Sequence, residues 1–287
     1  MPAREDAPAK INLSLKVLGR RPDRYHELQS LVVFAACGDV LTGEPADALS
    51  LDVAGPFAGA LAGEGDNLVL QAAKLLGDYL GIEPKAHLRL EKNLPVASGI
   101  GGGSADAAAA FRLLKKLWNA DTDPSALASL ALCVGADVPV CLDVAPALMW
   151  GKGELIARTD ALPPFWLVLA NPGVALSTAE VFGALAAPDL AEKCAGPILP
   201  AMRSFDDLTA WLADNGNDLE APARKLAPAI ADVLEALKAT KDCRLARMSG
   251  SGATCFGMFA DEVSARAAEA ALKKARPGWW VAAAKRL

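Results

Sequence analysis

The stretch of this sequence best suited to chemistry is a run of glycines that leads directly into a run of alanines. Gly99, Gly101, Gly102 and Gly103 are followed by Ser104 and then by an alanine-rich segment. Glycine lets a ligand approach the backbone closely, and alanine is the best helix former. We expect Ser104 to be the N-cap of a helix whose first turn offers unpaired N–H groups and a partial positive charge. Such a helix N-terminus suits a phosphate group.

This glycine-rich segment differs from the two best-known nucleotide-binding loops. No Gly-Lys-Ser or Gly-Lys-Thr follows the glycines, as a Walker A loop requires. Ser104 also stands where a dinucleotide fingerprint has its third glycine or an alanine. A flexible turn without a ligand is the alternative, but four glycines immediately before a capped helix favour a phosphate site.

Four other side chains could take part in a reaction, although each also has an ordinary structural explanation. Lys10 precedes an alternating strand, where a lysine taken alone is usually solvated. Asp137 follows Gly135 on an expected turn and could instead bond its own backbone. His26 is one of two histidines, and such a residue is more often a hydrogen-bonded surface group than a catalyst. Phe182, taken alone, fits a helix core better than a ligand site.

Hydrophobic periodicity predicts the elements that position these residues. Ile11–Leu18 alternates apolar and polar side chains and predicts a half-buried strand, and a second strand should open at Tyr25-His26. The helix after Ser104 should bury one face that holds Phe111, Leu114 and Trp118. Other segments with clear patterns are a helix after Asn67 (which Asp66 or Asn67 could cap), a short strand at His87–Leu90, and a helix at Leu226–Ala239.

Asp137 should lie between two well-marked segments. Asp123 and Pro124 predict the start of a helix that ends at Gly135. Pro139 should hold Val138 extended, because the residue before a proline avoids the helical region.

A second glycine-rich turn is expected in the C-terminal half. Ser249–Gly252 lies between apolar segments, Leu245–Met248 and Thr254–Phe259, that predict two strands. Ser177 and Glu180 have the spacing of a capping box and place Phe182 in the helix that follows. The proline-spaced stretch Pro197–Asp218 has no pattern that assigns it to a helix or a strand.

Composition limits the class of protein. The chain has 287 residues, of which 53% are hydrophobic, so a sizeable core is available. The net charge of −5 argues against a nucleic-acid surface. Six cysteines without a Cys-x-x-Cys pair predict reduced thiols and a cytoplasmic location. The N-terminus lacks an apolar signal core, and Ala126–Leu142 is short for a membrane span, so we expect no membrane association.

Three motifs occur in order along the chain: Pro8–Leu13 (Pro-Ala-Lys-Ile-Asn-Leu), Leu94–Ala107, and Met248–Phe259 with its Gly-Ser-Gly-Ala-Thr. Together they resemble the GHMP kinase superfamily, named for galactokinase, homoserine, mevalonate and phosphomevalonate kinases. The resemblance runs from about Ala7 to Phe259. It implies a two-domain α+β kinase with an N-terminal ATP-binding domain over residues 1–155 and a C-terminal domain over 156–287. The active site is expected in the cleft between the domains.

The resemblance also implies roles for the matching residues. Lys10 and Asp137 match the catalytic pair: Lys10 would stabilise negative charge and Asp137 would accept the proton of the alcohol. The residues that match the ATP site, where the nucleotide would bind with Mg²⁺, are Asn67, Lys92, Pro95, Gly99, Gly101, Gly102, Gly103 and Ser104. Those that match the acceptor site, where the two aromatic rings would flank a cytosine and the histidine would read its edge, are Asn12, Tyr25, His26, Thr178 and Phe182.

Within the superfamily, Tyr25-His26, Gly135–Pro139 and Asn171–Gly173 point to one substrate. It is the small molecule 4-diphosphocytidyl-2-C-methyl-D-erythritol, an intermediate of non-mevalonate isoprenoid biosynthesis, which would be phosphorylated on a hydroxyl. Arg24 departs from the glycine common in the family, so we expect the turn before Tyr25 to differ. Ser98 replaces a smaller residue and should fit the loop.

Three other functions remain open from the sequence. A kinase acting on homoserine or a mevalonate derivative would lack the Tyr25-His26 base reader. A non-catalytic nucleotide-binding protein of the same fold would have no need of Lys10 and Asp137. A dehydrogenase would need an acidic residue after the next strand of a parallel βαβ unit, which Val138-Pro139 fits poorly. We expect a monomer or a weak homodimer.

Overall fold

The computed structural model describes residues 2–61, 67–159, 162–190 and 194–287. They form two compact units, and each unit is discontinuous in sequence. Unit 1 holds the described residues of Met1–Ala9, Gly38–Val96 and Gly101–Val144, and unit 2 holds those of Lys10–Cys37, Ala97–Ile100 and Ala145–Leu287. Two long strands, β1 (Ala3–Arg20) and β2 (His26–Glu44), therefore contribute residues to both units. The family-based boundary near residue 155 stays a prediction.

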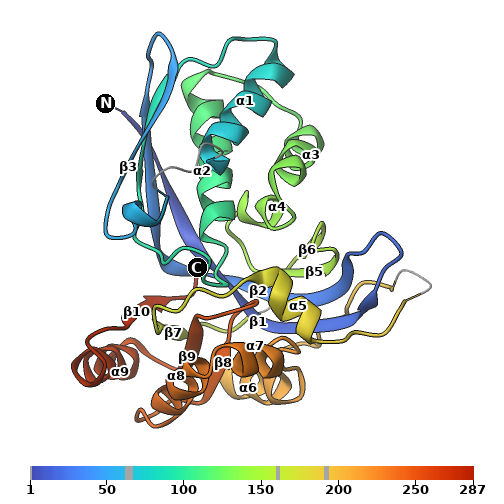
Figure 1. Ribbon diagram of the computed structural model, residues 1–287, viewed down its shortest axis with the longest axis vertical. Coiled ribbons are helices and arrows are strands. Elements are labelled where there is room, and N and C mark those ends of the chain that lie inside the picture. Colours follow the sequence, from blue (N-terminus) through green and yellow to red (C-terminus); the bar gives the residue numbers. More distant parts are fainter. Residues whose placement is uncertain (1, 62–66, 160–161, 191–193) are drawn as a thin grey trace. The chain divides into compact units, whose positions relative to one another are not determined.

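Unit 1 packs helices against a small sheet. The C-terminal part of β2 pairs antiparallel with β4 (Ala86–Glu91), which pairs parallel with β3 (Leu49–Ala54). Helices α1 (Leu68–Leu80), α2 (Gly102–Leu117) and α3 (Pro124–Val134) lie side by side (Figure 1). The alanines Ala107–Ala110 of α2 are buried, and their small side chains let α1 and α2 approach closely. The remaining elements of unit 1 are the 3-10 turn η1 (Ala58–Leu61) and the short helix α4 (Val138–Cys141).

Unit 2 contains two sets of paired strands. The first part of β2 pairs with β5 (Ala147–Gly151), which pairs with β6 (Leu155–Arg158). A four-stranded antiparallel sheet has the order β10-β7-β9-β8. Its strands are β7 (Trp166–Asn171), β8 (Leu245–Met248), β9 (Cys255–Phe259) and β10 (Trp280–Lys285). The helices of this unit are α5 (Thr178–Ala184), α6 (Phe205–Asp214), α7 (Glu220–Leu226), α8 (Ala229–Lys238) and α9 (Glu262–Ala275).

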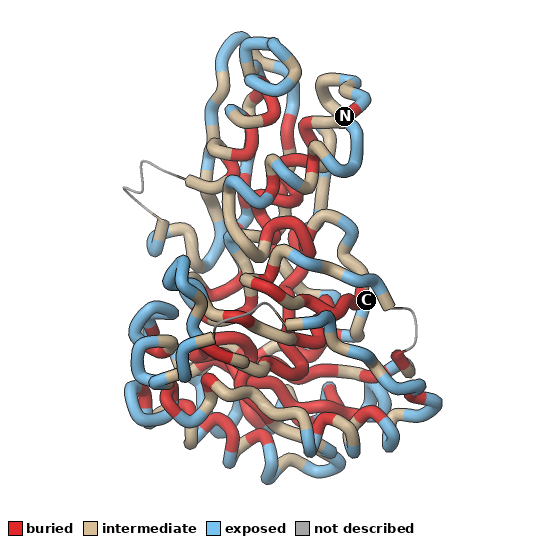
Figure 2. Tube along the Cα trace, turned by 90° about the vertical axis from the view of Figure 1, so that its right-hand side faces the viewer, coloured by how far each residue is buried: buried red, intermediate tan, exposed pale blue. Residues whose placement is uncertain are grey.

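The core of unit 2 lies between the four-stranded sheet and helices α8 and α9. It includes Val168, Ile230, Leu237, Phe259 and Leu272, all of which are buried. Figure 2 shows buried stretches in red along the chain, separated by exposed stretches on the outside. This core explains why the apolar pattern of Leu226–Ala239 correctly predicts a helix, α8, although that helix begins three residues later.

The predicted helix caps are mostly confirmed. Asn67 caps α1, because its Oδ1 accepts a hydrogen bond of 2.9 Å from the Val69 N–H; Asp66 lies outside the described residues. Asp123 caps α3 through the Ala126 N–H, and Gly135 ends that helix as predicted. Ser177 Oγ likewise accepts from the Glu180 N–H at the start of α5, the helix that carries Phe182.

Two local predictions are wrong. Ser104 is not the N-cap of α2: the helix begins at Gly102, and the cap is Gly101 at φ 62°, a conformation that glycine adopts without strain. Val138 is not extended but is the first residue of α4. A proline within the first helical turn needs no N–H partner there, so Pro139 is compatible with a helix start.

Some strands are longer than predicted, and other elements lie in segments for which the sequence predicted no helix or strand. Both β1 and β2 extend well beyond the segments expected from alternation. Strands β5 and β6 lie in a segment for which the sequence predicted no strand, and α6 lies in the stretch Pro197–Asp218 that the sequence left unassigned. Arg24 adopts φ 69° in the turn before Tyr25. This conformation is uncommon for any residue other than glycine, so it was not expected for an arginine.

Candidate active site

In unit 2, the start of the glycine-rich loop is interlocked with the second glycine turn. Gly99 has φ 76°, and a Cβ there would lie 2.5 Å from the Ser249 carbonyl oxygen and 2.6 Å from the Gly252 nitrogen. Ser249 Oγ donates a 3.0 Å hydrogen bond to the Gly99 carbonyl, and the Thr254 N–H donates to the Ser98 carbonyl. Gly99 is therefore required by the close approach of protein backbone, whatever ligand the loop binds.

Strand β1 brings Lys10 and Asn12 to this pair of turns. The Lys10 N–H donates to the Ile100 carbonyl at 2.9 Å, and the Asn12 N–H donates to Ser249 Oγ at 3.1 Å. Lys10 is 3% exposed, so it is not the solvated lysine that its sequence position alone favoured. Asn12 Nδ2 donates to Ser30 Oγ, whereas no donor in the described part of the chain reaches its buried Oδ1. Asn12 Oδ1 is therefore a buried acceptor without a donor among the described residues.

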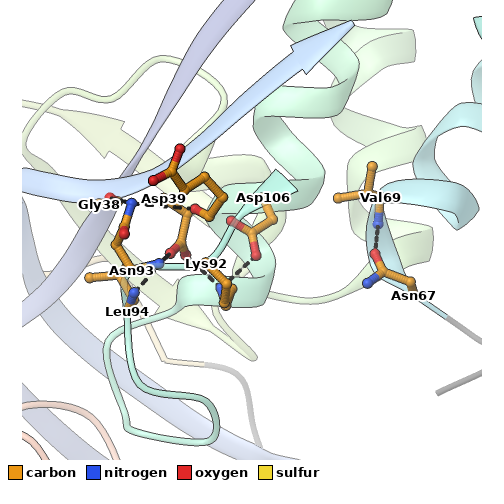
Figure 3. A network of polar contacts seen from close by, with 9 residues as sticks. Gly38, Asp39, Asn67, Val69, Lys92, Asn93, Leu94 and Asp106 are labelled. Atoms are coloured by element: carbon orange, nitrogen blue, oxygen red, sulfur yellow. Dashed lines mark hydrogen bonds and ion pairs between the residues drawn. The ribbon is translucent and has the colours of Figure 1, made fainter. Parts of the chain in front are cut away.

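In unit 1, the first turn of α2 is packed on a buried group of three charges. Lys92 Nζ lies 2.5 Å from Asp39 Oδ2 and 2.6 Å from Asp106 Oδ2 (Figure 3). Asp39 Oδ1 also accepts from the Asn93 and Leu94 N–H groups, at 2.5 and 2.8 Å. This network ties the chain that enters the glycine loop to strand β2 and helix α2.

The charges in this network perturb one another. Burial raises the pKa of Asp106 to about 7, against the opposing attraction of Lys92. Burial also acts to lower the pKa of Lys92, but the two carboxylates outweigh it and the net shift is upward. Lys92 is therefore a cation held by carboxylates, and its role in binding ATP stays a prediction.

Unit 2 also carries an aromatic group that fits a nucleobase. The rings of His26 and Phe182 are stacked with centroids 4.8 Å apart, and Tyr25 is 56% exposed beneath the Lys152 ammonium. Burial, followed by the positive charge of Arg20, lowers the pKa of His26, so its ring is neutral at pH 7. A neutral imidazole offers one donor and one acceptor, which suits the polar edge of a base.

Thr178 and Asp137 belong to different parts of the structure. Thr178 begins α5 and shares a 2.8 Å hydrogen bond with Ser251, so α5 is joined to the second glycine turn of unit 2. Asp137 lies in unit 1, half-buried on the turn between α3 and α4, as the sequence predicts.

Comparison with known proteins identifies the family. The N-terminal domain of GHMP kinases matches residues 67–151, and their C-terminal domain matches residues 186–278. The 4-diphosphocytidyl-2-C-methyl-D-erythritol kinase of Parvibaculum lavamentivorans is 60% identical over 280 residues, which is 98% of this chain and 97% of that protein. The chain belongs to the GHMP kinase family. It is an α+β kinase and hence a phosphotransferase.

Solved structures agree with this membership. A crystal structure of 4-(cytidine 5'-diphospho)-2C-methyl-D-erythritol kinase has a TM-score of 0.78 and 34% identity, and covers 99% of this chain and 98% of the other. L. major mevalonate kinase, in complex with R-mevalonate, has a TM-score of 0.71 at 15% identity, and the match covers 98% and 95% of the two chains. At 15% identity, the match to mevalonate kinase shows that the two proteins share a fold, and it carries no information about the substrate of this chain.

The structure groups the predicted site residues in two sets. Unit 2 holds Lys10, Asn12, Tyr25, His26, Gly99, Thr178 and Phe182, and unit 1 holds Asn67, Lys92, Pro95, Gly101, Gly102, Gly103, Ser104 and Asp137. Within unit 2, hydrogen bonds join Asn12 and Gly99 to Ser249 and Lys10 to Ile100, and a ring contact joins His26 to Phe182. The pairing of Lys10 with Asp137, and the cleft between the domains, stay predictions.

Sequence reasoning gave no individual role to four residues that support the site. Asp39 and Asp106 hold Lys92, and Ser249 joins β1 to Gly99. The buried Arg247 donates to the Leu13 carbonyl at 2.8 Å and so ties β8 to β1. A charged residue within an apolar strand, such as Arg247, indicates that the charge is paired or hydrogen-bonded in the fold. The sequence does not show which residue is its partner.

Within the described residues, no helix has the length and apolarity that a bilayer crossing requires, and no cluster of three His, Cys, Asp or Glu side chains could hold a metal. A kinase Mg²⁺ is typically held by one or two carboxylates together with substrate phosphates and waters.

Proposed function

We propose that this GHMP kinase transfers the γ-phosphoryl group of ATP to a hydroxyl of 4-diphosphocytidyl-2-C-methyl-D-erythritol, in non-mevalonate isoprenoid precursor biosynthesis. The 60% identity with a kinase named for that substrate, over almost the whole of both chains, supports the proposal. In the geometry, the observation that carries it is the His26–Phe182 stack beside the exposed Tyr25. Aromatic faces next to a neutral histidine suit a pyrimidine base.

The nucleotide is proposed to bind at the first glycine-rich segment rather than at the aromatic residues. The α2 N-terminus at Gly101–Ser104 presents backbone N–H groups whose partial positive charge favours phosphate oxygens. Mg²⁺, bound with the phosphates, would supply further positive charge. Asn67, Lys92, Pro95 and Gly99 keep their proposed places around the nucleotide, although Asn67 and Lys92 also have the structural contacts described above.

The proposed chemistry needs one base and one cation from the protein. The alcohol oxygen of the substrate forms a bond to the γ-phosphorus as the bond from that phosphorus to ADP breaks. Asp137 accepts or orients the alcohol proton, and Lys10 stabilises charge on the transferring group. Asn12 and Thr178 are proposed to contact the acceptor, and the unpartnered Oδ1 of Asn12 supports that role.

A substrate panel tests the proposal. ADP release should be measured with ATP and, in turn, the cytidyl substrate, homoserine and mevalonate. We expect turnover with the cytidyl substrate alone. Turnover with homoserine or mevalonate instead would favour the corresponding kinase, and nucleotide binding without turnover would favour a non-catalytic protein.

A substitution tests the proposed base. Asp137→Asn is nearly isosteric and keeps hydrogen-bonding capacity, so it should keep substrate affinity and lower kcat by about 10²-fold or more. Lys10→Ala should also lower kcat. If both residues act on one transition state, the double variant should lose less than the product of the single losses. A folded Asp137→Asn variant that retains more than about a tenth of the wild-type kcat would exclude Asp137 as the base.

The remaining parts of the proposal concern the protein in the cell. We propose a cytoplasmic enzyme that is a monomer or a weak homodimer and that binds neither nucleic acid nor membranes. The net charge of −5 supports the absence of nucleic-acid binding. Size-exclusion chromatography with light scattering would test the oligomeric state.

A further inference from the structure

The buried charges behind the first turn of α2 do not balance. Asp39, Lys92 and Asp106 are 0%, 2% and 3% exposed. When all three are ionised, one ammonium faces two carboxylates and the group carries a net charge of −1. An uncompensated buried charge is costly, so the proton occupancy of this group matters.

The group lies directly against the proposed phosphate site. A Cβ on Gly102 would be 3.2 Å from Lys92 Nζ and 3.7 Å from Asp39 Oδ2. Asp106 follows Gly102 by about one helical turn and lies on the same side of α2. A net negative charge here opposes the helix N-terminus, whose partial positive charge attracts the phosphates.

Asp106 is the member of the group that can take up a proton. Asp39 uses both oxygens, because Oδ2 meets Lys92 and Oδ1 accepts from two backbone N–H groups. Asp106 Oδ2 meets Lys92, whereas no donor in the described part of the chain reaches its buried Oδ1. Protonating Asp106 therefore disturbs fewer hydrogen bonds than protonating Asp39, and its pKa of about 7 places the change near neutral pH.

Other charged groups near α2 are less directly placed. On the helices packed against it, Lys74 and Asp78 of α1 are exposed, α3 and α4 carry no charged residue, and Asp137 before α4 is half-buried. On α2 itself, Arg112 and Lys116 pair with Glu5 of β1. Asp39 and Lys92 are the charged groups that act on Asp106.

We propose that binding of nucleotide phosphates at the N-terminus of α2 is coupled to uptake of a proton by Asp106. The inference rests on the proposed nucleotide site. The proton removes the net negative charge of the Asp39–Lys92–Asp106 group as the phosphates arrive. Because the protonated form binds the anion more tightly, affinity falls as pH rises above the pKa of Asp106 in the free protein, by at most about tenfold per pH unit.

Isothermal titration calorimetry with ADP and Mg²⁺ tests the coupling on the whole chain. The measurement is made at pH 7.5 in two buffers of different ionisation enthalpy, since the difference in observed heat gives the number of protons taken up. We expect between about a half and one proton for the wild type. Asp106→Asn should reduce this number to near zero, and the matched exposed variant Asp78→Asn should leave it unchanged. The ligand's own ionisation is the same in all three titrations.

A second variant keeps the test decisive if Asp106→Asn does not fold. Asp39→Asn makes the group neutral with Asp106 ionised, so proton uptake should again fall. Binding of ADP by the wild type without proton uptake, or uptake that persists in folded Asp106→Asn, would overturn the inference and leave the proposed function standing. A wild type that does not bind ADP at any pH would instead refute the nucleotide site itself, and the inference with it.

Discussion

Replacing Gly99 by alanine should destabilise unit 2 by more than its backbone conformation alone explains. At φ 76°, an L-residue costs about 1–2 kcal/mol in backbone strain. The new Cβ would also lie 2.5, 2.6 and 2.7 Å from three backbone atoms of the second glycine turn, which no side-chain rotation can relieve. Overpacking of this kind typically costs about 1–3 kcal/mol. The expected loss in the free energy of unfolding is therefore about 2–5 kcal/mol.

Gly173 provides a matched control in the same unit. Its φ is 77°, and an added Cβ would meet nothing within 4 Å. Gly173→Ala should thus carry the strain of about 1–2 kcal/mol without the collision. Both substitutions also reduce the freedom of the unfolded chain to the same extent, so that contribution cancels in the difference.

Urea unfolding, followed by circular dichroism, measures both losses. We expect Gly99→Ala to be less stable than Gly173→Ala by about 1–3 kcal/mol. Equal losses in the two variants would refute the reasoning, because they would show that the two glycine turns do not approach as closely as the structure has them.

Three further predictions concern the nucleotide, the acceptor and pH. Gly102→Val should greatly weaken binding of an ATP analogue, since the added side chain would press on the buried Lys92 Nζ and displace the first turn of α2; unchanged affinity by calorimetry in a folded variant would exclude the loop as the phosphate site. His26→Ala should raise the KM for the cytidyl substrate much more than that for ATP, and an equal rise in steady-state kinetics would indicate a general folding role. The pKa of Asp106 is raised from 3.8 to about 7 on folding, so this group's contribution to stability is lost as pH rises through that window. The unfolding free energy of the wild type relative to Asp106→Asn should accordingly decline from pH 4 to pH 7 in denaturant titrations, and a constant difference would contradict the raised pKa.

Local signals in the sequence predicted much of the secondary structure and the type of site. Helix α3 was recognisable because its start and its end both carry local signals: Asp123 and Pro124 at the start, and Gly135 at the end. Helix α2 was also predicted, but its first residue was wrong by one turn, because glycine and serine both make acceptable helix starts. Strands β5 and β6 were missed although they pair with each other; β5 also pairs with β2, which lies far away in the sequence.

The family followed from the sequence by itself, through three motifs whose order and residue types are specific. The supports of the site did not. Asn12 and Ser249 are 237 positions apart, Ser249 and Gly99 are 150 apart, and Asp39 and Lys92 are 53 apart. Periodicity reports which face of an element is buried, but it carries no information about which distant polar group that face meets. Only the tertiary structure shows that Gly99 is needed by a neighbouring backbone, and that Lys92 is shared by two buried carboxylates.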